Sequence, residues 1–259
     1  MSKPKRLKNA QIAKLKNEEG RKKDTSQHVF QNKKIDFKLN IQPKHELTPR
    51  QKEFLDIILD KKTNIVLLSG RPGTSKTWLS VYAALLCVNN KTHSDILFLR
   101  PPIEVGKSLG FLAGDKVTKE SVYLTPLYDK LDELLPRPEA DLLIKNETIV
   151  GTVPNFIRGQ SWNGKFIIVD EAQNIDATTL KTIISRFGRY SKLIFCFDPL
   201  QADVKGNVEV MRYFDLFNDE SSKERGIYSL SFKSEDIVRH PFLSYILDKI
   251  EGCYNPPIK

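Results

Sequence analysis

Eight residues constrain the fold of this chain more than any others, and they read Gly70-Arg71-Pro72-Gly73-Thr74-Ser75-Lys76-Thr77. They follow the apolar run 65–68 and precede an apolar segment that begins at Trp78. A strand, a tight loop and a helix start in this order surround a phosphate with backbone N–H groups. The segment matches the phosphate-loop pattern G-x-x-x-x-G-K-S/T except at Ser75, where the pattern has its second glycine. The alternative is an ordinary strand-to-helix turn with a solvated lysine.

The last residues of this segment carry the expected chemistry. Lys76 is expected to contact the outer phosphates of a nucleotide, and the Thr77 hydroxyl is expected to help hold Mg²⁺. A helix that starts here adds aligned N–H groups, whose partial positive charge favours phosphate. We therefore predict that the whole segment from Gly70 to Thr77 binds nucleotide.

A second motif lies about ninety residues further on, where the apolar run 166–169 ends in Asp170 and Glu171. In a nucleotide hydrolase, a carboxylate at the end of such a strand holds Mg²⁺ and the next one polarises the attacking water. The alternative is a buried strand followed by an acid that caps a helix. The two motifs support each other, because both belong at the same edge of a parallel sheet.

The composition fits one globular unit. The chain has 259 residues, of which 40% are apolar, enough for one good-sized core. Its longest apolar runs are far shorter than the about 18 residues that span a membrane, and no apolar segment follows the Lys-rich start. Neither a membrane partner nor a secretory signal is therefore expected. The three cysteines, Cys87, Cys196 and Cys253, show neither a disulfide framework nor metal-ligand spacing, which favours a reducing, cytoplasmic location.

The positive charge is concentrated at one end. Residues 1–40 contain 12 Lys/Arg and 4 Asp/Glu, a net charge of +8, whereas the remaining residues contain 29 and 28, a net charge of +1. A segment this polar buries too little apolar surface to fold alone. We expect an arm that binds nucleic-acid phosphates by releasing counterions. The alternative is a solubilising or targeting tail, because runs of charge are often only solvated.

Elsewhere the pattern alternates between strands and helices. Further strands are predicted at 96–99, 148–150, 192–197 and 227–232. Helices are predicted from Thr48-Pro49, after the loop as far as Val88, from Thr125-Pro126, from Asp176 to Gly188, and at 241–250. Residues 100–118 and 151–165 read as long loops. Strands that are apolar throughout and alternate with helices indicate a parallel sheet covered on both faces.

Several spaced blocks resemble the PhoH-like ATPases. Residues 100–115, RPPIEVGKSLGFLAGD, are similar to the family signature R-P-x-x-E-x-G-x-x-L-G-F-L-x-G-D. Later blocks follow in the same order: Asp170-Glu171-Ala172-Gln173-Asn174, Ser185-Arg186-Phe187-Gly188, Ser191-Lys192, Asp198 with Gln201 and Asp203, and Asp236-Ile237-Val238-Arg239-His240-Pro241. Thr48 to Gln51 looks like the glutamine motif on the adenine side. The resemblance covers roughly residues 46–250.

This resemblance implies a single RecA-like domain, related to superfamily-1 helicases, that hydrolyses ATP and acts on nucleic acid, often RNA. It implies that Gln51 contacts adenine and that Asp198 or Gln201 senses the γ-phosphate. It also suggests a homo-oligomeric ring, with a hexamer as one form, because one such domain supplies only one wall of an ATP site. The second wall would bring a transition-state arginine. The candidates are Arg239 first, then Arg186, and Arg158.

Three residues depart from the family pattern. Ser75 replaces a glycine at a position where a helix starts; serine is tolerable there, but its side chain would crowd the β-phosphate. Phe197 stands where the family usually has a glycine before Asp198. Arg71 takes a place usually held by a small residue or proline, and the sequence offers no physical account of it. These departures bear on the rate of turnover more than on nucleotide binding.

We therefore predict an α/β protein with a RecA-like P-loop NTPase fold, a mostly parallel sheet and helices on both faces, preceded by a basic flexible tail. Residues 1–45 are the predicted disordered arm, and residues 46–259 the ATPase domain. The predicted function is Mg²⁺-dependent ATP binding and hydrolysis coupled to binding or remodelling of RNA or single-stranded DNA, including helicase-like activity. The alternative is a nucleic-acid-binding module that retains ATP as a structural or regulatory ligand. A small-molecule kinase fits less well, because no acceptor site is evident.

Overall fold

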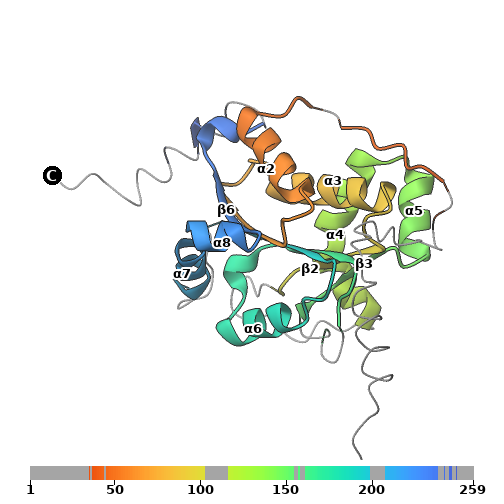
Figure 1. The fold of residues 1–259 in the computed structure, drawn as a ribbon. Helices are drawn as coiled ribbons and strands as arrows, with labels where there is room; N and C mark the ends of the chain where they lie inside the picture. Colours follow the sequence, from red (N-terminus) through yellow and green to blue (C-terminus); the bar gives the residue numbers. More distant parts are fainter. Residues whose placement is uncertain are drawn as a thin grey trace, which may run out of the picture.

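The computed structural model describes residues 35, 37–43, 45–102, 116–154, 157, 161–198, 208–238, 242, 245, 246 and 249. Its centre is a six-stranded sheet in the order β3-β2-β4-β5-β1-β6, in which all neighbouring strands are parallel (Figure 1). The strands are β1 (Ile65–Gly70), β2 (Asp95–Leu99), β3 (Ile149–Thr152), β4 (Lys165–Val169), β5 (Lys192–Phe197) and β6 (Ile227–Phe232). The predicted α/β fold is confirmed, and the sheet is parallel throughout.

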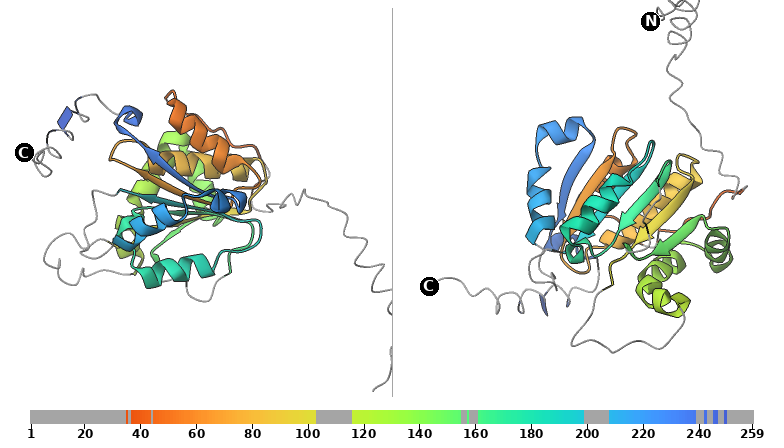
Figure 2. Two further views of the ribbon diagram at one scale, coloured as in Figure 1. Left: turned by 60° about the vertical axis from the view of Figure 1, so that its left-hand side comes forward. Right: turned by 90° about the horizontal axis from the view of Figure 1, so that it is seen from below.

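Helices cover both faces of the sheet (Figures 1 and 2). One face carries α2 (Pro49–Leu59), α3 (Lys76–Asn89), α4 (Lys116–Leu134) and α5 (Arg137–Lys145). The other face carries α6 (Ala177–Ser185) and α7 (Val208–Leu216). A short helix, α8 (Glu220–Glu224), leads into β6, and single turns of 3₁₀ helix follow β4 (η2, Ala172–Asn174) and β6 (η3, Ser234–Asp236).

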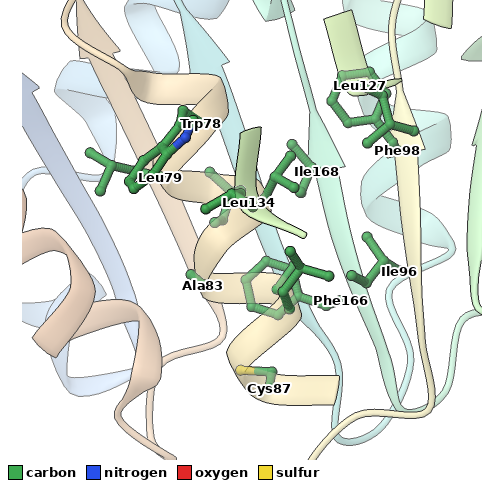
Figure 3. Packing of buried hydrophobic residues seen from close by; sticks show 14 of the residues in the cluster. Trp78, Leu79, Ala83, Cys87, Ile96, Phe98, Leu127, Leu134, Phe166 and Ile168 are labelled. Carbon is green, nitrogen blue, oxygen red and sulfur yellow. The ribbon is translucent and has the colours of Figure 1, made fainter. Parts of the chain in front are cut away.

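The inner strands are apolar at nearly every position because both of their faces are buried against helical layers, whereas the edge strands β3 and β6 are only partly buried. In β5, for example, all six residues are buried. Ile194 and Cys196 join the core under α2 to α5, while Leu193, Phe195 and Phe197 join the core under α6 and α7. Figure 3 shows the first core, with one face of α3 packed on β2 and β4. The sheet is thus packed between two separate hydrophobic cores, and the carboxyl ends of its parallel strands all lie at the same edge.

Two helix starts that carry a side-chain cap are where the sequence predicts them. Thr48 caps α2, since its hydroxyl accepts from the backbone N–H of Gln51 and the Gln51 side chain accepts from the N–H of Thr48. Asp176 caps α6 by accepting from the N–H of Thr179 at 2.6 Å. These two predictions are confirmed.

The predicted helix start at Thr125-Pro126 is wrong. Helix α4 already begins at Lys116, so Pro126 lies inside it and the loop predicted at 100–118 ends earlier than expected. A proline inside a helix removes one hydrogen bond. Here Leu127, Leu131 and Leu134, all at most 1% exposed, anchor the same helix in the core, and this burial outweighs the local cost.

The predicted end of α6 at Gly188 is also wrong, since the helix ends at Ser185. Arg186 and Phe187 close it with bonds to the carbonyls three residues earlier, and Phe187 then pairs with Trp162. Helices α5, α7 and α8 were not predicted. The predicted helix at 241–250 lies for the most part outside the described residues.

Residues 35 and 37–43 pack on the helical layer above the sheet. Ile35 and Leu39 are buried in its core, and the backbone N–H of Leu39 donates to Asn89 Oδ1 of α3 at 2.8 Å. The N–H of Gln42 donates to the carbonyl of Leu134, at the end of α4. These contacts precede the predicted boundary at residue 46, and the division into arm and domain stays a prediction. Among the described helices, none is both long enough and apolar enough to cross a membrane.

Candidate functional site

The two sequence motifs meet at one edge of the sheet. The loop after β1 and the acids after β4 lie at the carboxyl ends of their strands, and β5 lies between these strands. Asp198 follows β5 directly, so its position is between the loop and the acids. The sheet order therefore brings the loop, Asp170, Glu171 and Asp198 to the same place.

The backbone of the loop explains its glycines. A Cβ atom on Gly70 would lie 2.9 Å from Thr74 Oγ1 and 3.0 Å from Phe232 Cβ, which is too close for any side chain. Gly73 has φ of 84° and Ser75 has φ of 64°, both in the left-handed region. Ser75 was expected to act as an ordinary helix N-terminal residue, but its side chain makes no capping hydrogen bond and its backbone adopts a conformation that favours glycine.

Lys76 is the first residue of α3, and its side chain turns back into the loop. Its ammonium donates to the carbonyls of Gly70 at 2.5 Å and Arg71 at 3.1 Å. Burial lowers the pKa of Lys76, while the carboxylates of Asp198, Asp170 and Glu171 act in the opposite direction. A cation is thus held inside the loop, where the negative groups of the site face it.

Thr77 and Asp170 join the two motifs directly. The Thr77 hydroxyl donates to Asp170 Oδ1 at 2.7 Å, and Asp170 is only 2% exposed. Burial raises the pKa of Asp170, and the neighbouring Arg100 and Thr77 partly offset this. Two oxygen ligands of the kind that Mg²⁺ prefers therefore lie side by side.

Arg100 is a residue of this site that sequence reasoning missed. It follows β2, and its Nη1 lies 2.8 Å from Asp170 Oδ2, while its Nη2 lies 3.6 Å from Glu171 Oε1. The guanidinium thus pairs with both acids. Its signals in the sequence were its place at the end of a strand and at the start of the signature at residues 100–115, but neither reveals that β2 and β4 are neighbours.

Gln173 is a second residue that was quoted in a motif but given no role. Its Nε2 donates to Glu171 Oε2 at 2.6 Å, and its Oε1 accepts from the backbone N–H of Asp198 at 3.0 Å. The side chain is buried. Gln173 therefore ties the acid after β4 to the end of β5.

Gln51 lies behind the loop, and it is not among the residues that line the pocket. It is fully buried, and its Nε2 donates to the carbonyls of Thr74 at 3.3 Å and Asp236 at 3.1 Å. Its Oε1 accepts from Thr48, as described above. In this geometry Gln51 supports the loop from outside, and its contact with adenine stays a prediction.

The structure supplies a physical account for two departures from the family pattern. The guanidinium of Arg71 donates to Ser234 Oγ at 2.5 Å, so it links the loop to η3 after β6. Phe197 is 1% exposed and packs edge-to-face on Phe214 of α7, with ring centroids 5.4 Å apart. The bulk at this position fills the core on the α7 side and leaves the backbone of Asp198 at the site.

A pocket of about 340 Å³ contains these groups, within the size range of small-molecule sites. Its lining includes Pro72, Gly73, Ser75, Lys76, Thr77, Asp170, Glu171, Gln173 and Asp198. It continues beyond the loop to His45, Trp78, Lys130, Glu133 and Val238. One end is therefore acidic and the other partly aromatic.

Not every predicted residue is in this pocket. Arg186 follows α6 at the opposite edge of the sheet from the loop, where its carbonyl accepts from the N–H of Trp162. Gln201, Arg158 and Arg239 lie outside the described residues. The oligomeric ring and the arginine that would complete the site therefore stay predictions.

Comparison with known proteins gives one family. A family model described as "PhoH-like protein" matches residues 41–251. A PhoH-like protein of Bacillus subtilis (strain 168) is 32% identical over 205 residues, which are 78% of this chain and 62% of the relative. A PhoH-like protein of Mycobacterium leprae (strain TN) is 33% identical over 209 residues, which are 78% of this chain and 56% of the relative. The chain thus spans about three fifths of the length of these relatives.

A solved structure supports the fold. The large terminase from a thermophilic bacteriophage superimposes with a TM-score of 0.51 at 12% identity, over 79% of this chain and 50% of that chain. The same terminase in complex with ADP gives the same TM-score. At this identity the similarity concerns the fold alone.

Proposed function

The chain belongs to the PhoH-like protein family, and from this premise we propose that it binds ATP with Mg²⁺ and hydrolyses it in a reaction coupled to nucleic-acid binding. One observation carries the proposal. The Thr77 hydroxyl of the phosphate-loop segment hydrogen-bonds to Asp170 of the acidic motif at 2.7 Å, with Glu171 next to it in the same pocket. These are the parts that phosphoryl transfer to water requires at one place.

The residues present fit a nucleotide and its metal ion. Lys76 supplies a half-buried cation for the outer phosphates, and the loop from Gly70 to Ser75 supplies backbone N–H groups at the start of α3. Thr77 and Asp170 would hold Mg²⁺, which when bound neutralises charge on the phosphates. The lysine would exchange its bonds to the loop carbonyls for bonds to phosphate oxygens.

Glu171 is the group that would orient the attacking water. Its carboxylate is held at Oε2 by Gln173 and lies 3.6 Å from Arg100 at Oε1. The hydrogen bond from Gln173 fixes the direction of the carboxylate, and Gln173 in turn is fixed by the backbone of Asp198. Asp198 would face the terminal phosphate at the end of β5. A movement of its backbone would therefore shift Gln173, and through Gln173 the carboxylate of Glu171.

Nucleic acid is the proposed partner because the net charge of +9 is concentrated in the first 40 residues. The arm would contact the phosphate backbone without reading sequence, so RNA and single-stranded DNA both fit. Strand separation would be one outcome of such coupling.

A second candidate function has support of its own. Ser75 strains the loop, and Arg100 already pairs with both acids that hydrolysis needs. A nucleic-acid-binding module that retains ATP as a regulatory ligand, with little turnover, would have the same features.

One substitution tests the nucleotide site that both functions share, and a second separates the functions. Lys76→Ala is expected to abolish most ATP binding, because the outer phosphates lose their cation. Glu171→Gln is expected to bind ATP normally and to lose about 10²-fold or more in turnover, because it removes the base and keeps the shape. Calorimetric binding and phosphate release, measured on the same preparations, check both. Native turnover in Glu171→Gln would contradict the proposed role of this residue.

A further inference from the structure

The aromatic end of the pocket has no role in the function proposed so far. The ring of His45 packs against that of Trp78, with centroids 4.4 Å apart and planes tilted by 40°, and Trp78 stacks in turn on Tyr82 at 5.4 Å. His45 is exposed, whereas Trp78 is 2% exposed. One face of the imidazole is therefore covered by the indole, and the ring forms part of the pocket wall.

The charges in the pocket orient a nucleotide. Asp170, Glu171 and Asp198 gather at one end, where water would attack the terminal phosphate. The phosphate chain then runs over the loop, and the base must lie at the end away from the acids. Trp78 directly follows Thr77 in the first turn of α3, so the aromatic pair begins where the phosphate-binding residues stop.

The groups at this end of the pocket are better suited to stacking on the face of a base than to hydrogen bonding with its edge. His45 offers a ring face, and Val238 adds an apolar side chain. Gln51 has both amide hydrogens bonded to backbone carbonyls and lies outside the pocket lining. Of the two rings, His45 is the exposed one and Trp78 is buried in the core, so contact with a ligand falls to the imidazole.

We propose that His45 and Trp78 form the subsite for the nucleotide base, with the imidazole of His45 as the stacking surface, and that Gln51 acts by supporting the loop. This inference rests on the proposed nucleotide binding. It assigns affinity for the base to two residues that lie on either side of the phosphate loop in the sequence and pack against each other in the structure. Stacking on a ring face recognises aromatic bases as a class.

The test compares ATP with tripolyphosphate, which has the phosphates and lacks the base and ribose. When an aromatic side chain that stacks on a base is removed, affinity for the base typically falls roughly tenfold. His45→Ala is therefore expected to raise the Kd of ATP about tenfold and to leave the Kd of tripolyphosphate unchanged. His45→Phe is expected to retain the native affinity for ATP, because it keeps an aromatic face.

Two further variants control for indirect effects. Gln51→Ala is expected to weaken ATP and tripolyphosphate by the same factor, because it loosens the loop that binds the phosphates. Tyr190→Ala removes an exposed aromatic ring at the opposite edge of the sheet and is expected to change neither Kd. Calorimetry with Mg²⁺ present, together with melting temperatures, gives all of these values.

The outcomes are distinguishable. If wild-type protein binds ATP but His45→Ala weakens ATP and tripolyphosphate equally or not at all, the base subsite is wrong and the proposed function stands. If Gln51→Ala weakens the binding of ATP but not of tripolyphosphate, Gln51 contacts the base and the inference is again overturned. If wild-type protein binds neither ligand, both the inference and the proposed function fail.

Discussion

Ser75 takes the backbone conformation for which the phosphate-loop pattern has a glycine. At φ of 64° a residue with a Cβ atom is strained by about 1–2 kcal/mol, while glycine adds a smaller entropic cost through the unfolded chain. The serine hydroxyl makes no capping bond that would offset this strain. The loop thus has its usual shape and an unusual residue.

We therefore expect Ser75→Gly to raise the free energy of unfolding by about 0.5–1 kcal/mol and to leave turnover equal or faster. Lys91→Gly is the matched control, since Lys91 has φ of 56° in an exposed turn far from the loop. It is expected to gain similar stability with no effect on turnover. Urea unfolding and phosphate release measure both quantities. A clear loss of stability in Ser75→Gly would show that the serine makes a contact that favours it.

At the level of single residues, the chemical role of a side chain was easier to predict from the sequence than the residues that it contacts. Lys76, Thr77, Asp170 and Glu171 were found because their spacing along the chain is itself the signal. The pairing of Arg100 with the acids depends on β2 lying next to β4, and strand order is a property of the whole sheet. For the same reason, the position of Gln51 behind the loop could not be read from its motif.

At the level of helices and strands, boundaries set by local signals were predicted correctly, and boundaries set by tertiary packing were not. The starts of α2 and α6 were predicted correctly, because a capping side chain lies within three residues of its partner. The start of α4 was predicted wrongly, because a proline normally marks a boundary and here is carried within a buried helix. The strands were predicted well, since burial on both faces leaves an apolar run that no surface helix shows.

Lys192 shows how a strand and a helix are joined on the side opposite the site. Its ammonium, at the start of β5, donates to the carbonyls of Asp60 at 2.6 Å and Thr63 at 2.7 Å, where α2 ends. Burial lowers the pKa of Lys192, because removing the ammonium from water disfavours its charged form. The Asp60 carbonyl also accepts from the N–H of Thr63, so Lys192 ties together both ends of the turn that follows α2.

Lys192→Met is expected to lower the free energy of unfolding by about 2 kcal/mol, because it removes two charge-assisted hydrogen bonds that join β5 to the turn after α2. Lys61→Met, which changes an exposed lysine in the turn next to them, is expected to change stability little. ATP affinity should be native in both, since the loop lies at the other edge of the sheet. Chemical denaturation gives the comparison; equal stability of the two variants would contradict the structural role of Lys192.

At the level of the whole molecule, charge and core are separated along the chain. Ile35 and Leu39 are buried, so a truncation that tests the arm should keep them and remove residues 1–34. That segment contains 11 Lys/Arg and 3 Asp/Glu, a net charge of +8. If half of this charge contacts phosphates, deletion is expected to reduce the slope of log affinity for single-stranded RNA against log salt by about 3 to 4.

Affinity for ATP is expected to be unchanged by this deletion, because none of the residues that line the pocket is removed. Fluorescence anisotropy over a salt series, with full-length and shortened protein, gives the slopes. An unchanged slope would leave the arm as a solubilising or targeting tail.

The most direct test of coupled hydrolysis is phosphate release from ATP with Mg²⁺, measured with and without single-stranded RNA or DNA. We predict release above the level of Glu171→Gln, and a further rise when nucleic acid is added. If the wild-type protein binds ATP yet releases no more phosphate than Glu171→Gln in either condition, the chain is a binding module with a nucleotide ligand and the proposed coupling is wrong.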